Sequence, residues 1–378
     1  MNDALTDVPT TDVPTTDAPA EVPTDVLIVG SGPTGLTLAC DLVRRGARVR
    51  VIDQRSAPHR ESRGKALHPT SLEVFETLGV AERMTSTGSA GLIFRKYFDG
   101  EYINDTPRDA TALFMGQWQI EEILRDRLAE LGVDVEYDAE VKAVDQDATG
   151  VRVTLADGRT LRAAYLAGCD GGRSTIRRQL GISFEGRTSD EEAMVVGDVT
   201  AQGLSREYWH QWFTSDGGAM MLCPIPGTET FQLQASPETD EQGQRLAPSL
   251  EGFQRLFDQH ARMPGIRLTE ATWLSTWRVN VRMADRMRQG RCFLAGDAAH
   301  VHPIAGGLGM NTGIQDAATL GRILAEALAG SGDERILEAY EAERLPAAAH
   351  LLADTSARHD RVREAVREPG RGIEAALN

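Results

Sequence analysis

The sequence predicts an α/β fold in which a parallel sheet carries helices and a second, antiparallel sheet is inserted, and three observations support this prediction. Residues 25–53 follow the pattern strand, glycine turn, helix, strand. Two later apolar stretches, within 165–182 and 290–328, also run into polar turns. Between them, residues 188–280 lose the helical period and alternate short apolar stretches with glycine and polar turns, which is typical of an antiparallel sheet.

The first unit has the glycine spacing of a dinucleotide-binding turn. The apolar run 26–29 suits a buried parallel strand, and Gly30, Gly32 and Gly35 follow it in the order G-x-G-x-x-G. Gly30 allows the tight turn, Gly32 lets the backbone approach a pyrophosphate, and Gly35 lets helix and strand pack closely. The other residues of this turn and helix start that we expect at the phosphates are Ser31, Pro33 and Thr34.

An acidic residue closes this unit. Asp53 ends the strand 49–52 about twenty residues after the turn, where a carboxylate can accept hydrogen bonds from an adenosine ribose, and Gln54 follows it. The alternative is a glycine-rich turn that binds nothing. Because strand, helix and terminal acid occur together, we favour a Rossmann-like dinucleotide site.

The second motif is the pair Asp170-Gly171, which follows an apolar strand within 165–182. It repeats the change from strand to polar turn, so Asp170 is a candidate for contact with a ligand. A carboxylate before two glycines is also a good turn residue. Both interpretations of Asp170 stay open.

The third motif begins with the buried strand 292–295, after which Asp297 lies at the carboxyl end of the strand, where open α/β sheets place ligands. The alternative for Asp297 is an N-cap of the next helix, which we predict over 310–328. A glycine-rich loop leads into that helix, and a helix N-terminus of this kind stabilises an anion. The candidate residues of the loop and the helix start are Gly306, Gly307, Gly309, Met310 and Asn311.

Composition narrows the class of protein. The formal net charge of −16 and the isoelectric point near 5.0 argue against nucleic acid or an anionic membrane as a partner, since both require a basic surface. No window approaches the ~18 uninterrupted apolar residues that a membrane span needs. The four cysteines lie far apart, which suggests a reducing compartment and hence the cytoplasm, and His300 and His302 stand too far from other ligand types for a metal site.

The two ends of the chain differ from the rest. Residues 1–24 repeat a Pro- and Thr-rich acidic pattern that cannot bury enough apolar surface to offset its ordering entropy, so we expect a disordered tail. This stretch has neither the basic start nor the apolar run of a secretory signal. Residues 366–378 are expected to form a C-terminal tail.

Together the three motifs resemble the group A flavoprotein monooxygenases, the FAD-dependent aromatic hydroxylases related to 4-hydroxybenzoate hydroxylase, and especially the aromatic polyketide hydroxylases. The match covers nearly everything after residue 25. It implies that the chain binds FAD, is reduced by NADPH or NADH, and uses dioxygen to oxygenate an aromatic, polycyclic substrate. By the same resemblance, Gly30 to Gly35 hold the pyrophosphate, Asp53 the ribose and Asp297 the ribityl chain, while 306–311 lie against the pyrimidine edge of the flavin.

Two further residues are assigned by the resemblance alone. Arg63 looks like the family arginine at the pyrophosphate, and Gln117 looks like the family glutamine beside the ribityl chain. For Arg63 the alternative is a solvated surface arginine, because Arg55, Arg60 and Lys65 are equal candidates on charge alone.

The resemblance also divides the chain. It implies an FAD-binding domain made of 25–90, 112–187 and 281–365, and a substrate-binding sheet made of 91–111 and 188–280. The thioredoxin-like C-terminal domain that such hydroxylases usually carry is not expected here, which is a departure from the family pattern. The sheet would cover the flavin ring, and its candidate pocket residues are Trp212, Phe213, Leu222, Pro224 and Gln232. For each of them the alternative is a place in the core of the sheet.

Two other functions are considered. A flavin-dependent halogenase shares the fold, but its WxWxIP stretch reads MMLCPIP here. The chain could also bind flavin without oxygenating anything, as a partner or chaperone subunit of a biosynthetic complex. Consumption of NADPH or NADH in air, with aromatic compounds added, distinguishes these functions from the main one.

The N-terminal repeat gives a first prediction. Removal of residues 1–22 should leave the melting temperature and activity unchanged, because the repeat has too few apolar groups to dock on a folded surface. Thermal unfolding of the full and shortened chains tests this, and a loss of more than a few degrees would show that the segment packs.

Overall fold

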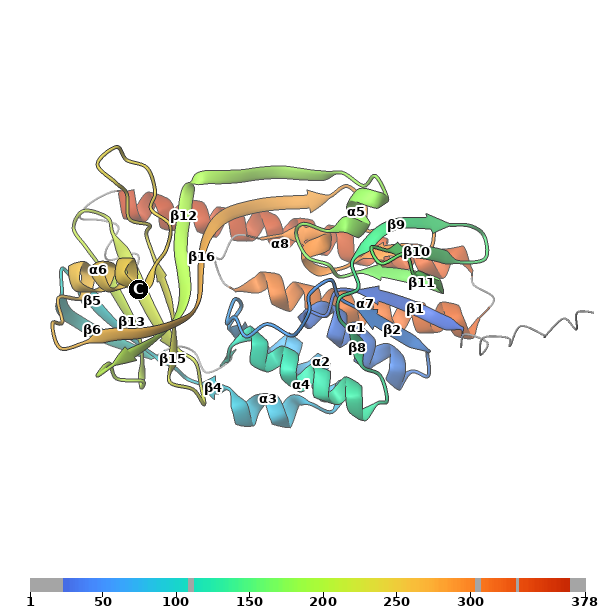
Figure 1. Cartoon of the computed structure of the whole chain (residues 1–378), viewed down its shortest axis with the longest axis horizontal. Helices are drawn as coiled ribbons and strands as arrows, with labels where there is room; N and C mark the ends of the chain where they lie inside the picture. Colours follow the sequence, from blue (N-terminus) through green and yellow to red (C-terminus); the bar gives the residue numbers. More distant parts are fainter. Residues whose placement is uncertain (1–22, 108–111, 303–306, 331–332, 368–378) are drawn as a thin grey trace, which may run out of the picture.

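The computed structural model describes residues 23–107, 112–302, 307–330 and 333–367. The predicted α/β fold with an inserted sheet is confirmed: two eight-stranded sheets make up the molecule, one at each end of its long axis (Figure 1). Of the tails, residues 1–22 and 368–378 lie outside the described part, so the expected disorder of the first segment stays a prediction.

The first sheet contains the dinucleotide motif. Its order is β17-β18-β11-β1-β2-β8, with β10 and β9 continuing from β11, and β1 pairs in parallel with β2 and with β11. The parallel pair β11 and β18 adds the strands that precede the second and third motifs. The strands are β1 Thr24–Val29, β2 Val49–Ile52, β8 Val135–Glu136, β9 Val141–Gln146, β10 Val151–Leu155, β11 Thr160–Gly168, β17 Arg288–Gln289 and β18 Cys292–Leu294.

Helix α1 packs against α4 and α7, and α7 packs against α8. The crossing of α1 and α7 is close because glycines replace larger side chains there: a β-carbon on Gly313 would lie 2.4 Å from Thr34 Oγ1, and one on Gly321 would lie 2.3 Å from Asp41 Oδ2. The helices are α1 Pro33–Arg44, α2 Pro69–Leu78, α3 Ala81–Thr87, α4 Gln117–Glu130, α5 Thr175–Gln179, α6 Leu250–Ala261, α7 Leu308–Ala329 and α8 Glu334–Arg367, with a 3-10 turn, η1, at Gly296–Ala298.

The second sheet has the order β19-β16-β12-β15-β14-β13-β5-β6. The expected antiparallel pairing holds for its other neighbours, but β13 and β5 run parallel, because β5 enters from a distant part of the chain. The strands are β5 Ile93–Phe98, β6 Glu101–Pro107, β12 Phe184–Gln202, β13 Tyr208–Phe213, β14 Ala219–Pro224, β15 Thr230–Ala235, β16 Arg267–Ala284 and β19 His300–Val301. A small third sheet contains β3 Ala66–Leu67, β7 Leu113–Phe114 and β4 Ser89–Ala90.

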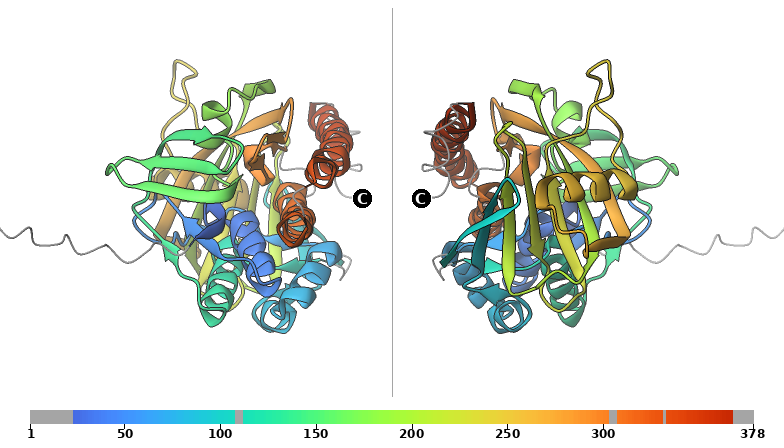
Figure 2. Two further views of the ribbon diagram at one scale, coloured as in Figure 1. Left: turned by 90° about the vertical axis from the view of Figure 1, so that its right-hand side faces the viewer. Right: turned by 90° about the vertical axis from the view of Figure 1, so that its left-hand side faces the viewer.

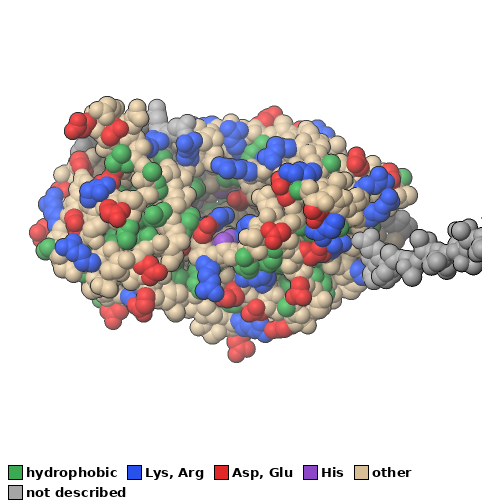
Figure 3. All heavy atoms as spheres, in the orientation of Figure 1, with side chains coloured by type: hydrophobic (Ala, Val, Ile, Leu, Met, Phe, Trp, Pro, Cys, Tyr) green, Lys and Arg blue, Asp and Glu red, His purple; other side chains and the backbone are tan. Residues whose placement is uncertain are grey.

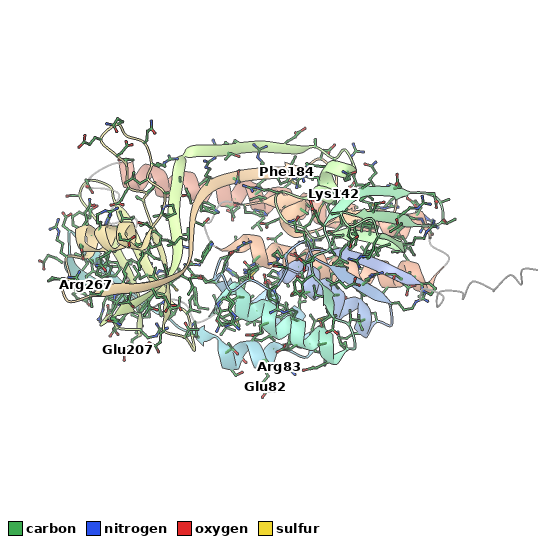
Figure 4. The ribbon with its side chains drawn as sticks, viewed as in Figure 1. Glu82, Arg83, Lys142, Phe184, Glu207 and Arg267 are labelled. Carbon is green, nitrogen blue, oxygen red and sulfur yellow. The ribbon has the colours of Figure 1, made fainter. Side chains whose placement is uncertain are left out.

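The two longest strands, β12 and β16, join the two ends of the molecule. They pair from Phe184 with Ala284 to Gln202 with Arg267, so the ribbon extends from the first sheet into the second. Figure 4 labels Phe184 and Arg267, the first residues of the two strands, at opposite ends of this ribbon. Figure 2 views the molecule from each of its two ends.

The second sheet has two different faces. One face is apolar and is covered by α6, whose Phe253 and Phe257 pack on Trp212 and Leu222. Trp212 is fully buried, and its ring lies next to those of Tyr97 and His210. The structure thus places Trp212 and Leu222 in the core of the sheet, which is the alternative that the sequence analysis gave for them. The period of two along a strand identifies two sets of side chains, but it does not say which set a helix covers.

The opposite face is tied to the first part of the molecule. Asp198 of β12 accepts hydrogen bonds from the backbone N–H of Ser62, at 2.8 Å, and from its hydroxyl. Gln232 of β15 donates to Ser62 Oγ at 2.7 Å and to the carbonyl of Arg63 at 3.1 Å. This face is thus held against the loop that carries Arg63.

Two general features concern the described residues only. No helix among them is long and apolar enough to cross a membrane. The four cysteines are free and buried, as Cys40, Cys169, Cys223 and Cys292.

The placement of Trp212 gives a second prediction. Trp212→Ala should destabilise the protein by about 3–5 kcal/mol, because it leaves a large cavity under α6. Tyr102→Ala is the control, since Tyr102 is 56% exposed. Chemical denaturation measures both, and an equal, small effect of the two substitutions would contradict the buried position of Trp212.

Candidate active site

The first turn of the dinucleotide motif is shaped by close backbone contacts. Gly30 has a φ of +104°, and a β-carbon there would lie 2.4 Å from the carbonyl oxygen of Cys169 in the strand-end turn after β11. A β-carbon on Gly35 would lie 2.0 Å from the carbonyl oxygen of Gly30. Both positions therefore exclude a side chain for reasons of packing alone.

Gly32 differs from its neighbours, because a β-carbon there would meet no atom within 4 Å. Gly32 is also the N-cap of α1, and no side chain caps the helix. The free N–H groups of the first turn and the positive end of the helix dipole thus face open space. This arrangement fits a pyrophosphate.

Asp53 lies at the end of β2 and is nearly fully buried. Its carboxylate accepts hydrogen bonds from the N–H and the hydroxyl of Ser31, both at 2.8 Å, and from the backbone and guanidinium of Arg55. Burial alone would raise the pKa of Asp53, but the hydrogen bonds from Arg55 and Ser31 lower it to about 2. The carboxylate is therefore ionised at neutral pH.

Arg55 is a residue that the sequence interpretation weighed only as a competitor of Arg63. The structure places it on Asp53, where a ribose was expected, so a bound ribose would share the carboxylate with Arg55 or displace it. The sequence feature that could have indicated this contact is the position of Arg55 two residues after Asp53. Gln54, between the two, is exposed.

Gln117 and Met310, far apart in sequence, both lie beside Gly64, the residue after Arg63. Gln117 Oε1 accepts a hydrogen bond from the N–H of Gly64 at 3.1 Å, and a β-carbon on Gly64 would lie 3.3 Å from Met310 Sδ. The side chain of Arg63 is half exposed and pairs with Glu61 at 2.5 Å. The structure thus brings together one residue from each of three separate segments.

Asp297 belongs to η1, so the alternative that it caps the long helix is wrong: α7 begins only at Leu308. Its side chain is exposed, and no described residue donates a hydrogen bond to its carboxylate. Surrounding protein nevertheless desolvates it and raises its pKa, against the opposing effect of His300 and Arg63. A carboxyl that is accessible but surrounded by protein lies in a hollow, and Figure 3 shows the surface hollowed between the two parts of the molecule.

The start of α7 offers backbone groups to this region. Gly307 is the N-cap, with a φ of +64°, and no side chain caps the helix. The side chain of Asn311 is fully used: it accepts from His68 and Ser71 and donates to the carbonyls of Ala66 and Gly307. The backbone N–H groups of the first turn, which includes Gly309 and Met310, are left for a ligand. Gly306 lies outside the described residues.

The two carboxylate oxygens of Asp170 have different surroundings. Oδ2 accepts hydrogen bonds from the N–H groups of Thr175 and Ile176, at 2.6 and 3.1 Å, and so caps α5. Oδ1 is buried and has no partner among the described residues, and burial raises the pKa of the carboxyl. A role as a turn residue, which was one of the two interpretations of Asp170, therefore explains the contacts of Oδ2 but not the burial of Oδ1.

The expected pocket residues of the second sheet separate into two groups. Gln232 lies on the face toward the first sheet, whereas Pro224 pairs with Phe231 on the α6 face, together with Trp212 and Leu222. Phe213, at the end of β13, is half-buried. The face toward the first sheet also carries side chains that the sequence interpretation missed: Lys96, Gln211, Gln234, Trp273 and Trp277.

Comparison with known proteins gives the family. A family model described as FAD binding domain matches residues 23–355. The chain belongs to this FAD-binding family. Gly32, Asp297 and the start of α7 provide the open anion site, the free carboxyl and the helix N-terminus that FAD requires, so the residues present fit the cofactor.

Members of the FAD-binding family that are similar to this chain are enzymes. A flavin-dependent monooxygenase of Mycobacteroides abscessus is 41% identical over 357 residues, which cover 89% of this chain and 74% of the relative. The structure is similar to that of aklavinone-11 hydroxylase in a complex with FAD and aklavinone, with a TM-score of 0.76, 27% identity, and coverage of 89% of this chain and 68% of that one. It is also similar to the Diels-Alderase PyrE3, with a TM-score of 0.71, 34% identity, and coverage of 89% and 73%.

These findings confirm the predicted resemblance and the class of enzyme, an FAD-dependent monooxygenase. Relatives in the family act on polyketide-type aromatic compounds. Among the described residues, no three His, Cys, Asp or Glu side chains are grouped so as to hold a metal ion.

The open space at Gly32 gives a third prediction. Gly32→Val should fold normally but lose FAD, because the added side chain would occupy the space that the pyrophosphate needs. Gly265→Val is the matched control, since a β-carbon on the exposed Gly265 also meets no atom within 4 Å. Flavin absorbance after gel filtration, with the melting temperature as a check of folding, measures the effect; retention of FAD by Gly32→Val would place the pyrophosphate elsewhere.

Proposed function

We propose that this enzyme uses NADPH or NADH to reduce bound FAD and then inserts one oxygen atom of dioxygen into a polycyclic, polyketide-type aromatic substrate. The substrate would lie between the flavin and the face of the second sheet that is turned toward the first part of the molecule. The four buried free thiols fit a reducing compartment, and we propose that the enzyme works in the cytoplasm.

The composition of that sheet face is the observation that carries the proposal. Trp273 pairs with Asp198, and Trp277 pairs with Met194. Directly paired residues share a face, and Asp198 contacts Ser62 of the first part, so both tryptophans face the same way. Both are half-buried, whereas the apolar side chains under α6 are fully buried. Two accessible tryptophans on a face that also carries amide side chains favour a flat aromatic ligand.

Polar groups on the same face would orient the ligand. Gln211 and Gln234 lie there, and Gln234 donates a hydrogen bond to Gln232 at 2.8 Å. Amide groups can hydrogen-bond phenol and quinone oxygens in either direction. Lys96 is buried, and the face just described contains no arginine that could clamp a small carboxylate.

Other residues of this chain would hold and orient the cofactor. We assign the pyrophosphate to Gly32 and the start of α1, the ribose to Asp53 and Arg55, and the ribityl chain to Asp297 with Gln117 nearby. The first turn of α7 would stabilise negative charge at the pyrimidine edge of the ring. FAD, when bound, supplies the redox and oxygen chemistry, while the protein binds, orients and excludes water.

The size of the substrate follows from the apolar surface available. At about 25 cal/mol per Å² of buried apolar surface, a three- or four-ring ligand gains several kcal/mol more than a single ring, before ordering costs. No arginine lies on this face, and the ammonium of Lys65 there already donates to Gln232 and lies over the ring of Trp209, so we expect apolar contact to supply most of the affinity. A monocyclic acid should therefore bind weakly.

The substrate proposal gives a fourth prediction. In a titration followed by the spectrum of the oxidised flavin, a tetracyclic phenol should bind more tightly than 4-hydroxybenzoate. Trp273→Ala or Trp277→Ala should raise the dissociation constant of the tetracycle by about tenfold or more, in line with the burial lost. Tyr102→Ala, an exposed aromatic residue on the far strand β6, should change nothing.

The possible outcomes separate the alternatives. Tighter binding of the benzoate would contradict the substrate class while leaving the flavin site intact. Because the Diels-Alderase shares the fold, a chain that binds FAD and the tetracycle but never oxidises NADPH or NADH in air would be a flavin-binding protein without oxygenase activity.

A further inference from the structure

Four polar side chains form a hydrogen-bonded row in the first part of the molecule. Arg344 Nε of α8 donates to Asp316 Oδ1 of α7 at 2.8 Å, and Asp316 Oδ2 lies 2.7 Å from His300 Nε2. His300 Nδ1 lies 3.0 Å from His302 Nε2. Asp316 and His300 are fully buried and His302 is 8% exposed, so this row of side chains is isolated from bulk water over most of its length.

The hydrogen bonds limit which nitrogens can carry protons. Burial alone would raise the pKa of Asp316, but His300 and Arg344 hold it below its ordinary value, so Asp316 is a carboxylate and can only accept. His300 Nε2 therefore carries a proton. Burial lowers the pKa of His302 to about 3, with His300 adding to the effect, so the ring of His302 is neutral at pH 7.

Two arrangements of protons satisfy these contacts. In the first, His302 Nε2–H donates to a neutral His300, and His302 Nδ1 is a bare acceptor. In the second, His300 is an imidazolium ion that donates to His302 Nε2, and His302 Nδ1 carries the proton. The positive charge of the second arrangement rests on His300, next to the carboxylate of Asp316, and not on His302.

The row of hydrogen-bonded side chains ends at His302 Nδ1. This atom is buried and has no hydrogen-bond partner among the residues that the structure describes. His302 lies against the first turn of α7, because a β-carbon on Gly309 would be 3.9 Å from both Cβ and Cδ2 of His302. That turn is where the proposed function places the pyrimidine edge of the flavin.

We propose that His302, His300 and Asp316 form a proton store that opens to the flavin site at His302 Nδ1; the inference rests on the proposed position of the flavin. A proton from water or from the ligand binds His302 Nδ1, the proton on His302 Nε2 passes to His300 Nδ1, and His300 becomes an imidazolium paired with Asp316. Reversal returns the proton. Arg344 and Asp316 act as positioning residues, since they reach the ligand only through the histidines.

Several charged or titratable side chains of neighbouring elements lie around this proton store. Asp297 of η1 interacts electrostatically with His300, and Arg344 of α8 donates its hydrogen bond to Asp316. Tyr340 of α8 is directed away, since its hydroxyl donates to the carbonyl of Leu294. Arg282 of β16 pairs with Val301 in the sheet, and its guanidinium donates to Phe184 O and Thr188 Oγ1.

A reduced flavin adds negative charge near His302, and this should draw a proton into the store. The test is the midpoint potential of FAD in the holoenzyme, measured from about pH 6 to about pH 9, where histidines titrate readily. In the wild-type enzyme we expect up to one more proton taken up per two-electron reduction than in His302→Gln or Asp316→Asn. His260→Gln is the matched control, because His260 is equally buried and bonds the carbonyl of Leu256 on α6.

The outcomes are separable from those of the proposed function. Failure of the wild-type chain to bind FAD would overturn the proposed function. Normal FAD binding with the same pH dependence in the wild type, His302→Gln and Asp316→Asn would overturn the proton store alone. Nitrogen-15 spectra of labelled histidine in the oxidised holoenzyme give a second measure: a bare Nδ1 on His302 is expected, and a protonated Nδ1 there without an imidazolium at His300 would contradict the proposal.

Discussion

The site depends on the close approach of three chain segments around Thr34. Its Oγ1 occupies the space that a β-carbon would need at Gly296, at 2.6 Å, and at Gly313, at 2.4 Å. The start of α1, the turn after β18 and the second turn of α7 therefore meet at one point. As a result, Gly32, Asp297 and the N-terminus of α7 belong to segments that are in contact, although they come from opposite ends of the sequence.

The second constraint is the attachment of the second sheet to this frame. The paired strands β12 and β16 span both parts, and the contacts of Asp198 and Gln232 with Ser62 hold the sheet face against the loop that carries Arg63. Covered by α6, the other face is packed and fixed. The second sheet is thereby held opposite the residues that we assign to the cofactor, which fits the proposal of a flat ligand between them.

The sequence predicted the features that depend on local pattern. The glycine turn at 30–35, the strand-end acids and the long helix after Gly307 follow from spacing, and the helix extends beyond its predicted start by only two residues. It did not predict the face of the second sheet that α6 covers, because Trp212 and Trp273 look alike in a strand and differ only in their tertiary neighbours. The row of hydrogen-bonded side chains from Asp316 to His302 and the position of Arg55 beside Asp53 likewise depend on tertiary contacts.

The central claim is that this hollow holds a flavin which transfers oxygen to an aromatic ligand on the tryptophan face. The most direct test is a reaction of the FAD-loaded enzyme with NADPH, and in parallel with NADH, together with a tetracyclic phenol and oxygen-18 gas, followed by mass spectrometry of the organic product. We predict a product with one labelled oxygen atom from the gas, formed only when the phenol is present together with NADPH or NADH. A product without label, or a phenol left unchanged while it binds to the flavin enzyme, would contradict the account.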